Sequence, residues 1–115
     1  MRQWENTLIP PDYSIKQTIE VISKDSLQVA LVVNSERKLL GIVTDGDFRR
    51  GILKGIGLDA SVTKIMANSN TTASYKEDQG TLLNIMRKKR IRHLPLLDEQ
   101  GAVTELLTLF EKFKN

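Results

Sequence analysis

The chain has 115 residues, 40% of them hydrophobic and 27% charged, which suits one compact domain or two very small ones that share a core. It has no cysteine and one histidine, which excludes disulfides, thiol nucleophiles, thiolate metal sites and multi-histidine zinc sites. Seventeen Lys and Arg against fourteen Asp and Glu give a net charge of +3, which mildly favours a phosphate-bearing partner. With no secretory signal and no apolar stretch near the roughly 18 residues of a membrane helix, we expect a cytoplasmic protein without membrane contact.

The first half of the sequence predicts two helices separated by a pair of strands. Apolar residues at helical spacing indicate each helix, and short β-branched apolar runs indicate buried strands. The expected elements are a helix capped by Ser14 with Ile15, Ile19 and Ile22 on its apolar side, strands over 29–33 and 38–43, a helix from Thr44 or Asp45 to Gly55 or Gly57, and a helical turn from Ser61.

The second half repeats this order. A polar stretch over 68–73 leads into a helix that begins near Asp78, with Leu82, Leu83 and Met86 on its apolar side. Strands are expected over 94–97 and 103–107, joined by a polar turn, and a final helix over 109–113.

The two halves align without a gap at an offset of 64 residues, so that Ile22 meets Met86 and the apolar pairs of both strands coincide. We interpret this register as an internal duplication. Neither half, at roughly 50 to 60 residues, could bury an adequate core alone. The predicted fold is therefore α+β: two βαββα repeats about a pseudo-twofold axis, packed sheet to sheet, over 1–66 (with an N-terminal lead-in) and 67–115. Two related clefts would lie between them.

The sharpest local motif is the run from Gly41 to Asp47, where a strand passes directly into a helix. Free N–H groups at such a helix start attract an anion, and the Thr44 hydroxyl could add a hydrogen bond to phosphate. The Asp47 carboxylate could accept both hydroxyls of a ribose diol. The alternative is that Thr44 only caps the helix and Asp47 only complements its dipole.

The pattern Gly-hydrophobic-x-Thr-x-x-Asp at 41–47 resembles the signature of cystathionine-β-synthase (CBS) domains, which occur in tandem. The segment Arg90 to Asp98 is similar to the family's basic-His-Leu-Pro-hydrophobic-hydrophobic-Asp segment, and the resemblance covers about 7–113. It implies a regulatory module, with no catalysis of its own, that binds AMP, ADP, ATP or S-adenosylmethionine between its repeats. The acidic pair Asp45 and Asp47 at a helix start is explained by capping and by the helix dipole rather than by a metal site.

The resemblance also assigns ligand contacts in one cleft. Asp47 would hold the ribose, Thr44 would approach ribose or phosphate, Arg92 and His93 would contact phosphate, and backbone around Ile9 and Ala30 would line the base pocket. The other cleft departs from the pattern, because Glu105 and Glu111 replace its Gly and Asp, and Gln28 and Val29 replace the basic pair. We expect one functional cleft and one weakened or empty.

The string Thr-Asp-Gly-Asp-x-Arg-Arg-Gly at 44–51 resembles the CBS pair that precedes sugar-phosphate nucleotidyltransferase domains. This implies a regulatory fragment of such an enzyme or a stand-alone relative, with an attached or partner nucleotidyltransferase and a homodimer formed through the CBS helices.

Two other functions stay open. The basic cluster over 87–92 could bind a nucleic-acid backbone, although cations at a helix C-terminus explain most of it and Trp4, Tyr13 and Tyr75 are too isolated for a base-stacking surface. We therefore regard nucleic acid as a less favoured partner. A purely structural dimerisation module with empty clefts is the remaining alternative.

Overall fold

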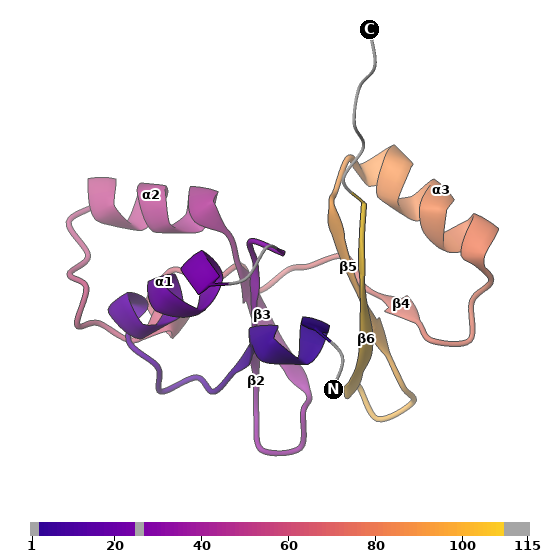
Figure 1. The fold of residues 1–115 in the computed structure, drawn as a ribbon, viewed down its shortest axis with the longest axis horizontal. Helices are drawn as coiled ribbons and strands as arrows, with labels where there is room; N and C mark the ends of the chain where they lie inside the picture. The colour runs from indigo at the N-terminus through magenta and orange to yellow at the C-terminus, as the bar shows by residue number, and fades with distance from the viewer. Residues whose placement is uncertain (1–2, 25–26, 110–115) are drawn as a thin grey trace, which may run out of the picture. The chain divides into compact units, whose positions relative to one another are not determined.

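The computed structural model describes residues 3–24 and 27–109, and divides the chain into two units, Met1–Asn70 and Thr71–Asn115 (Figure 1). Each unit carries its own three-stranded sheet, and each is described by itself. The α+β class expected from the sequence is confirmed.

The first unit is built on a sheet with strand order β1-β2-β3, in which β1 is parallel to β2 and β2 is antiparallel to β3. Its elements in chain order are the 3-10 helix η1 (Gln3–Thr7), β1 (Leu8–Ile9), α1 (Ile15–Lys24), β2 (Ala30–Val33), β3 (Leu39–Val43), α2 (Asp45–Leu53) and the 3-10 helix η2 (Val62–Lys64). The helices and strands expected in this half are present, with each strand beginning one residue later than expected and α2 ending at Leu53, before the expected Gly55 or Gly57.

The second unit has the same plan, with strand order β4-β5-β6 and the same parallel and antiparallel pairings. Its elements are β4 (Ala73–Ser74), α3 (Gln79–Lys89), β5 (His93–Leu97) and β6 (Val103–Thr108). The polar stretch before α3 ends in the two-residue strand β4, which forms because Ala73 and Ser74 pair with Leu96 and Leu97. The helix expected over 109–113 lies, except for Leu109, outside the described residues.

The offset of 64 residues relates α1, β1, β2 and β3 of the first unit to α3, β4, β5 and β6 of the second, with boundaries that agree to within one residue. Shifting α1 by 64 gives 79–88, against Gln79–Lys89 for α3. The register irregularity of the first hairpin falls between Val32 and Val33, and that of the second between Leu96 and Leu97. A duplication explains a match in fine detail that two unrelated α+β units would not share.

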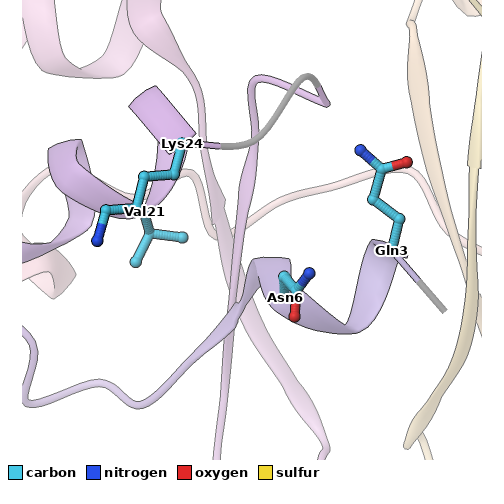
Figure 2. A pocket seen from close by; sticks show the side chains of 4 residues that line it. All are labelled: Gln3, Asn6, Val21 and Lys24. Carbon is cyan, nitrogen blue, oxygen red and sulfur yellow. The ribbon is translucent and has the colours of Figure 1, made fainter. Parts of the chain in front are cut away.

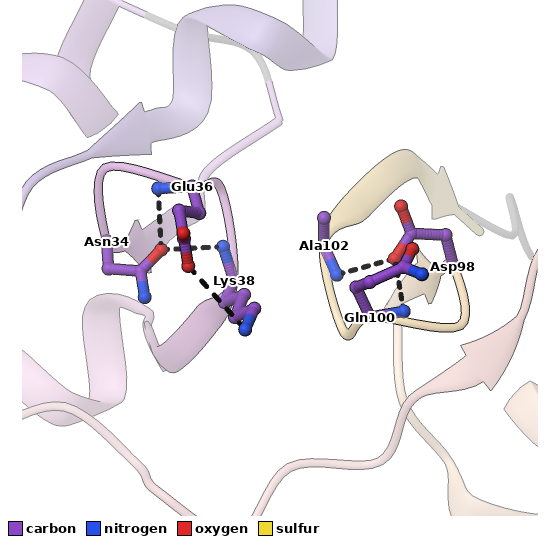
Figure 3. Close-up of polar contacts among 6 residues, drawn as sticks. All are labelled: Asn34, Glu36, Lys38, Asp98, Gln100 and Ala102. Carbon is purple, nitrogen blue, oxygen red and sulfur yellow. Dashed lines mark hydrogen bonds and ion pairs between the residues drawn. The ribbon is translucent and has the colours of Figure 1, made fainter.

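The hairpin turns show the repeat at atomic level (Figure 3). In the first turn the Asn34 side-chain oxygen accepts the N–H groups of Glu36 (2.8 Å) and Lys38 (3.0 Å). Sixty-four residues later Asp98 Oδ1 accepts those of Gln100 and Ala102, both at 2.9 Å. Both turns are Asx turns, which a short side-chain oxygen at the first position stabilises.

Each helix start carries a capping residue. Ser14 Oγ accepts the Gln17 N–H at 3.0 Å while Gln17 Oε1 accepts the Ser14 N–H at 2.8 Å, a reciprocal capping box. Asp78 caps α3 by accepting the Thr81 N–H at 2.7 Å. Ser14 as a cap and a helix entered near Asp78 are both confirmed.

Each unit has its own apolar cluster. In the first, α1 and α2 pack Ile15, Ile22 and Phe48 against Val32 and Val43 of the sheet. In the second, α3 packs Leu82 and Met86 against Leu94 and Leu96. Burial of these side chains removes apolar surface from water and holds each helix against the sheet of its own unit.

The three α-helices among residues 3–24 and 27–109 have 10, 9 and 11 residues. Within the described part of the chain, none is long and apolar enough to cross a bilayer.

Candidate functional site

The site begins where β3 ends at Val43 and α2 begins at Asp45, with Thr44 between them as the N-cap. Thr44 is extended (φ −126°, ψ 176°), and its carbonyl accepts the N–H groups of Asp47 and Phe48. Thr44 as a helix cap is therefore confirmed.

The Asp47 carboxylate is held by three hydrogen bonds. Oδ2 accepts the Thr44 N–H at 2.9 Å and the Thr44 hydroxyl at 3.2 Å, and Oδ1 accepts Arg50 Nη2 at 2.8 Å. The Asp47 side chain is 12% exposed, whereas that of Arg50 is 66% exposed. The local capping role expected as an alternative is thus present, and it fixes the orientation of the carboxylate that the resemblance assigns to ribose.

Three glycines of the motif at 41–51 are explained by close approaches. A Cβ on Gly41 would lie 2.6 Å from Met66 Sδ and 2.9 Å from the Ala67 carbonyl oxygen. A Cβ on Gly51 would lie 2.6 Å from Ile65 Cγ2, and one on Gly46 would lie 3.2 Å from Arg50 Nη1. Gly41 and Gly51 let the segment over 62–67 pack against β3 and α2, and Gly46 leaves room for the Arg50 guanidinium.

Arg50 contacts Asp47, although none of the predictions made from the sequence gave it a role in the site. The spacing of the residues could have identified this contact, because residues three apart lie side by side on a helix and residues two apart do not. Asp47 and Arg50 are three apart, and they form the observed ion pair.

Ile9 and Ala30 belong to the core, with 2% and 0% of their surfaces exposed. Ala30 pairs with Val43, next to Thr44, and Ile9 pairs with Val32. The structure therefore brings Ala30, Thr44 and Asp47 to one end of the β2–β3 hairpin. Any contact from Ile9 or Ala30 to a ligand would come from the backbone.

In the second unit Arg92 directly precedes β5, and His93 is the first residue of that strand. Arg92 is exposed, and its carbonyl accepts the Leu109 N–H at 2.9 Å. His93 is half-buried and pairs with Thr108, which occupies the position of Thr44 in the repeat. Arg92 and His93 therefore lie at the end of the β5–β6 hairpin that corresponds to the end of the β2–β3 hairpin where Thr44 lies.

The weakened motif of the second unit is described in part. Glu105, at the position of Gly41, is exposed on β6 opposite Leu96. Glu111, at the position of Asp47, lies outside the described residues.

The basic cluster surrounds the C-terminus of α3. Arg87, Lys88 and Lys89 form the last turn and are exposed, and Arg90 is the C-cap in the left-handed conformation. Cations at this end of a helix complement its dipole.

A hollow of about 280 Å³ lies between η1 and α1, lined by Gln3, Asn6, Val21 and Lys24 (Figure 2). It contains none of the six residues that the resemblance assigns to a ligand, and no motif in the sequence indicated it.

The repeated order of elements, register and turns defines a tandem-repeat α+β protein with a strand-to-helix capping motif in its first copy. The chain belongs to the CBS domain family, whose model matches residues 5–54 and again 62–111. CBS domains are regulatory modules, and this chain is a tandem CBS pair.

Curated relatives contain the pair within longer chains. The chain is 35% identical over 95 residues to the uncharacterized protein RP505 of Rickettsia prowazekii, with 83% of this chain and 30% of that protein covered. It is 30% identical over 105 residues to inosine-5'-monophosphate dehydrogenase of Aquifex aeolicus (88% and 20% covered), and 27% identical over 96 residues to arabinose 5-phosphate isomerase GutQ of Escherichia coli (84% and 30% covered). The chain therefore spans less than a third of the length of these relatives.

Solved structures share the fold. A CBS domain structure, NE2398, is 30% identical with a TM-score of 0.76, with 89% of this chain and 80% of that chain covered. The CBS domain protein PAE2072 from Pyrobaculum aerophilum, complexed with AMP, is 19% identical with a TM-score of 0.77, with 94% and 87% covered.

Proposed function

We propose that this chain is a ligand-sensing regulatory module that binds an adenosine-containing nucleotide, of the AMP, ADP or ATP type, in one cleft between its repeats. The observation that carries the proposal is the Asp47 carboxylate, fixed and mostly buried at the start of α2 in a CBS pair. CBS pairs commonly bind adenosine nucleotides, and the complex of PAE2072 with AMP supports that ligand class. S-adenosylmethionine, which carries an adenosyl group but no phosphate, is the other candidate ligand.

In the proposed complex the ribose hydroxyls donate hydrogen bonds to Asp47. Charge-assisted hydrogen bonds of this kind are stronger than neutral ones, and the partial burial of Asp47 limits competition from water. Thr44 contacts ribose or phosphate. The first N–H groups of α2 have no partner within the helix and favour an anion nearby.

The second unit supplies the positive charge. Arg92 and His93 would contact the phosphate, in keeping with the exposed guanidinium at the start of β5. Backbone around Ile9 and Ala30 would line the base pocket. The second cleft would bind weakly or not at all, because acidic Glu105 and Glu111 stand at its Gly and Asp positions.

The regulated output is an enzyme, in the same or a partner chain. Two relatives that contain this pair are named for activity on phosphorylated metabolites, inosine-5'-monophosphate dehydrogenase and arabinose 5-phosphate isomerase. The string at 44–51 favours a sugar-phosphate nucleotidyltransferase as the partner, and homodimerisation through the helices would couple two modules. A ligand regulates such an enzyme only if it binds two arrangements of the module unequally.

The test is calorimetric titration of the chain with AMP, ADP, ATP and S-adenosylmethionine. We expect saturable AMP binding that Asp47→Ala weakens at least tenfold, because the ribose loses its acceptor. Asp45→Ala is the matched control, since Asp45 is exposed in the same helical turn. Circular dichroism checks that Asp47→Ala, which also loses a capping contact, stays folded.

Binding to none of the four ligands would contradict the proposal and favour the structural module. A nucleic-acid-binding module on the basic cluster would be favoured by two results together. Wild type and Asp47→Ala would bind AMP equally, and both would bind oligonucleotides of any sequence with an affinity that falls steeply as the salt concentration rises.

A further inference from the structure

Arg50 is the cation that contacts the proposed ribose-binding carboxylate. Its Nη2 lies 2.8 Å from Asp47 Oδ1, and its guanidinium lies across Gly46, 3.2 Å from where a Cβ would stand. Arg49, the neighbouring residue, is exposed and makes no comparable contact among the described residues. The two arginines therefore form a natural pair of test and control positions.

Acceptor capacity limits how a diol can bind. An ionised carboxylate offers about four acceptor positions. Thr44 occupies two of them on Oδ2, and Arg50 occupies one on Oδ1. One acceptor position is therefore left, whereas a ribose diol donates two hydrogen bonds, so the second hydroxyl has no acceptor unless Arg50 moves.

Arg50 is the partner that can move. Its side chain is 66% exposed, and solvent-exposed ion pairs hold their partners weakly. Thr44 cannot withdraw as easily, because its N–H is part of the backbone at the start of α2.

We propose that Arg50 determines specificity for a phosphorylated ligand: it leaves Asp47 when the ribose diol binds and pairs with the phosphate of the same nucleotide. This inference rests on the proposed function. A nucleoside displaces Arg50 without offering it a new partner, whereas a nucleotide offers a phosphate that the planar guanidinium can bind with two hydrogen bonds. Because of this exchange, the affinity of the ribose site depends on whether the ligand carries a phosphate.

The test compares AMP with adenosine on wild type, Arg50→Ala and Arg49→Ala. Arg50→Ala should weaken AMP about tenfold or more while adenosine binds as tightly as before or more tightly, because its competitor for Asp47 is gone. The preference for AMP over adenosine should therefore fall at least tenfold. Arg49→Ala should leave both affinities within twofold of wild type.

Arg50→Lys refines the test, since it keeps the charge and loses the planar fork, and should give an intermediate preference. Equal weakening of AMP and adenosine by Arg50→Ala would show that Arg50 only orients Asp47, and would overturn the inference. Saturable AMP binding with an unchanged preference in Arg50→Ala would overturn it while leaving the proposed function standing. Wild type that binds neither compound would contradict both.

Discussion

Replacing Gly41 by Ala tests how the structure explains the glycines of the site. Gly41 and Gly80 both have backbone angles that alanine adopts without strain, since only Gly55 and Gly101 among the glycines have positive φ. They differ in their surroundings. A Cβ on Gly41 would lie within 3 Å of Met66 and of the Ala67 carbonyl, whereas one on Gly80 would meet only Asp78 Oδ1, at 3.6 Å.

The magnitude follows from two opposing effects. Gly→Ala at a compatible position stabilises a protein by about 0.4–1 kcal/mol, because the unfolded chain loses freedom. Overpacking costs about 1–3 kcal/mol, and at Gly41 the obstacle includes a backbone oxygen that accepts the Ile42 N–H at 3.1 Å. We expect Gly41→Ala to lower the free energy of unfolding by about 1–2 kcal/mol and Gly80→Ala to raise it by up to about 1 kcal/mol.

Urea denaturation followed by far-ultraviolet circular dichroism measures both variants against wild type. Opposite signs for one and the same substitution would support the packing account. A Gly41→Ala protein as stable as Gly80→Ala would refute it, because the close approach to Ala67 would then carry no cost.

Other predictions concern the second unit. Arg90 has φ +56° as the C-cap of α3, so Arg90→Gly should raise the free energy of unfolding by about 1 kcal/mol in denaturant titration, while Arg90→Ala, which removes the charged side chain but keeps the Cβ, should not. Asp98→Asn should be nearly neutral because Asn34 serves the equivalent turn, and Asp98→Ala should cost about 1 kcal/mol in the same assay. The backbone N–H of Thr81 holds the pKa of Asp78 below its ordinary value of 3.8. As the pH falls below 3.8 and through the lower pKa of the folded state, wild type should therefore lose stability relative to Asp78→Asn. A difference in the free energy of unfolding between the two proteins that does not change with pH would contradict capping by the Asp78 carboxylate.

Much of this fold could be predicted because its signals are local. A capping side chain followed by apolar residues at helical spacing marks the start of α1, and the duplicated register carries the same prediction to α3. Thr44 as the N-cap of α2 follows from the same rule. These contacts join residues within four positions of each other, so the sequence alone contains them.

What could not be predicted depends on partners distant in sequence. The strand β4 has only two residues, and it exists because Ala73 and Ser74 pair with residues more than twenty positions away. Glycine is needed at position 41 because the Ala67 carbonyl approaches its backbone closely. Ala67 lies 26 positions further along the chain and pairs with Ile42 outside the named strands. The choice of Arg50 over Arg49 was predictable from helical spacing once Asp47 was placed inside α2.

The most direct test of the central claim is a titration of the isotopically labelled chain with AMP, followed by amide chemical shifts. We expect saturable changes at the backbone of Thr44 to Asp47 and at Arg92 and His93, with one AMP bound per chain. The absence of saturable change at these positions, or changes confined to the basic residues 87–90 that inorganic phosphate reproduces, would contradict it.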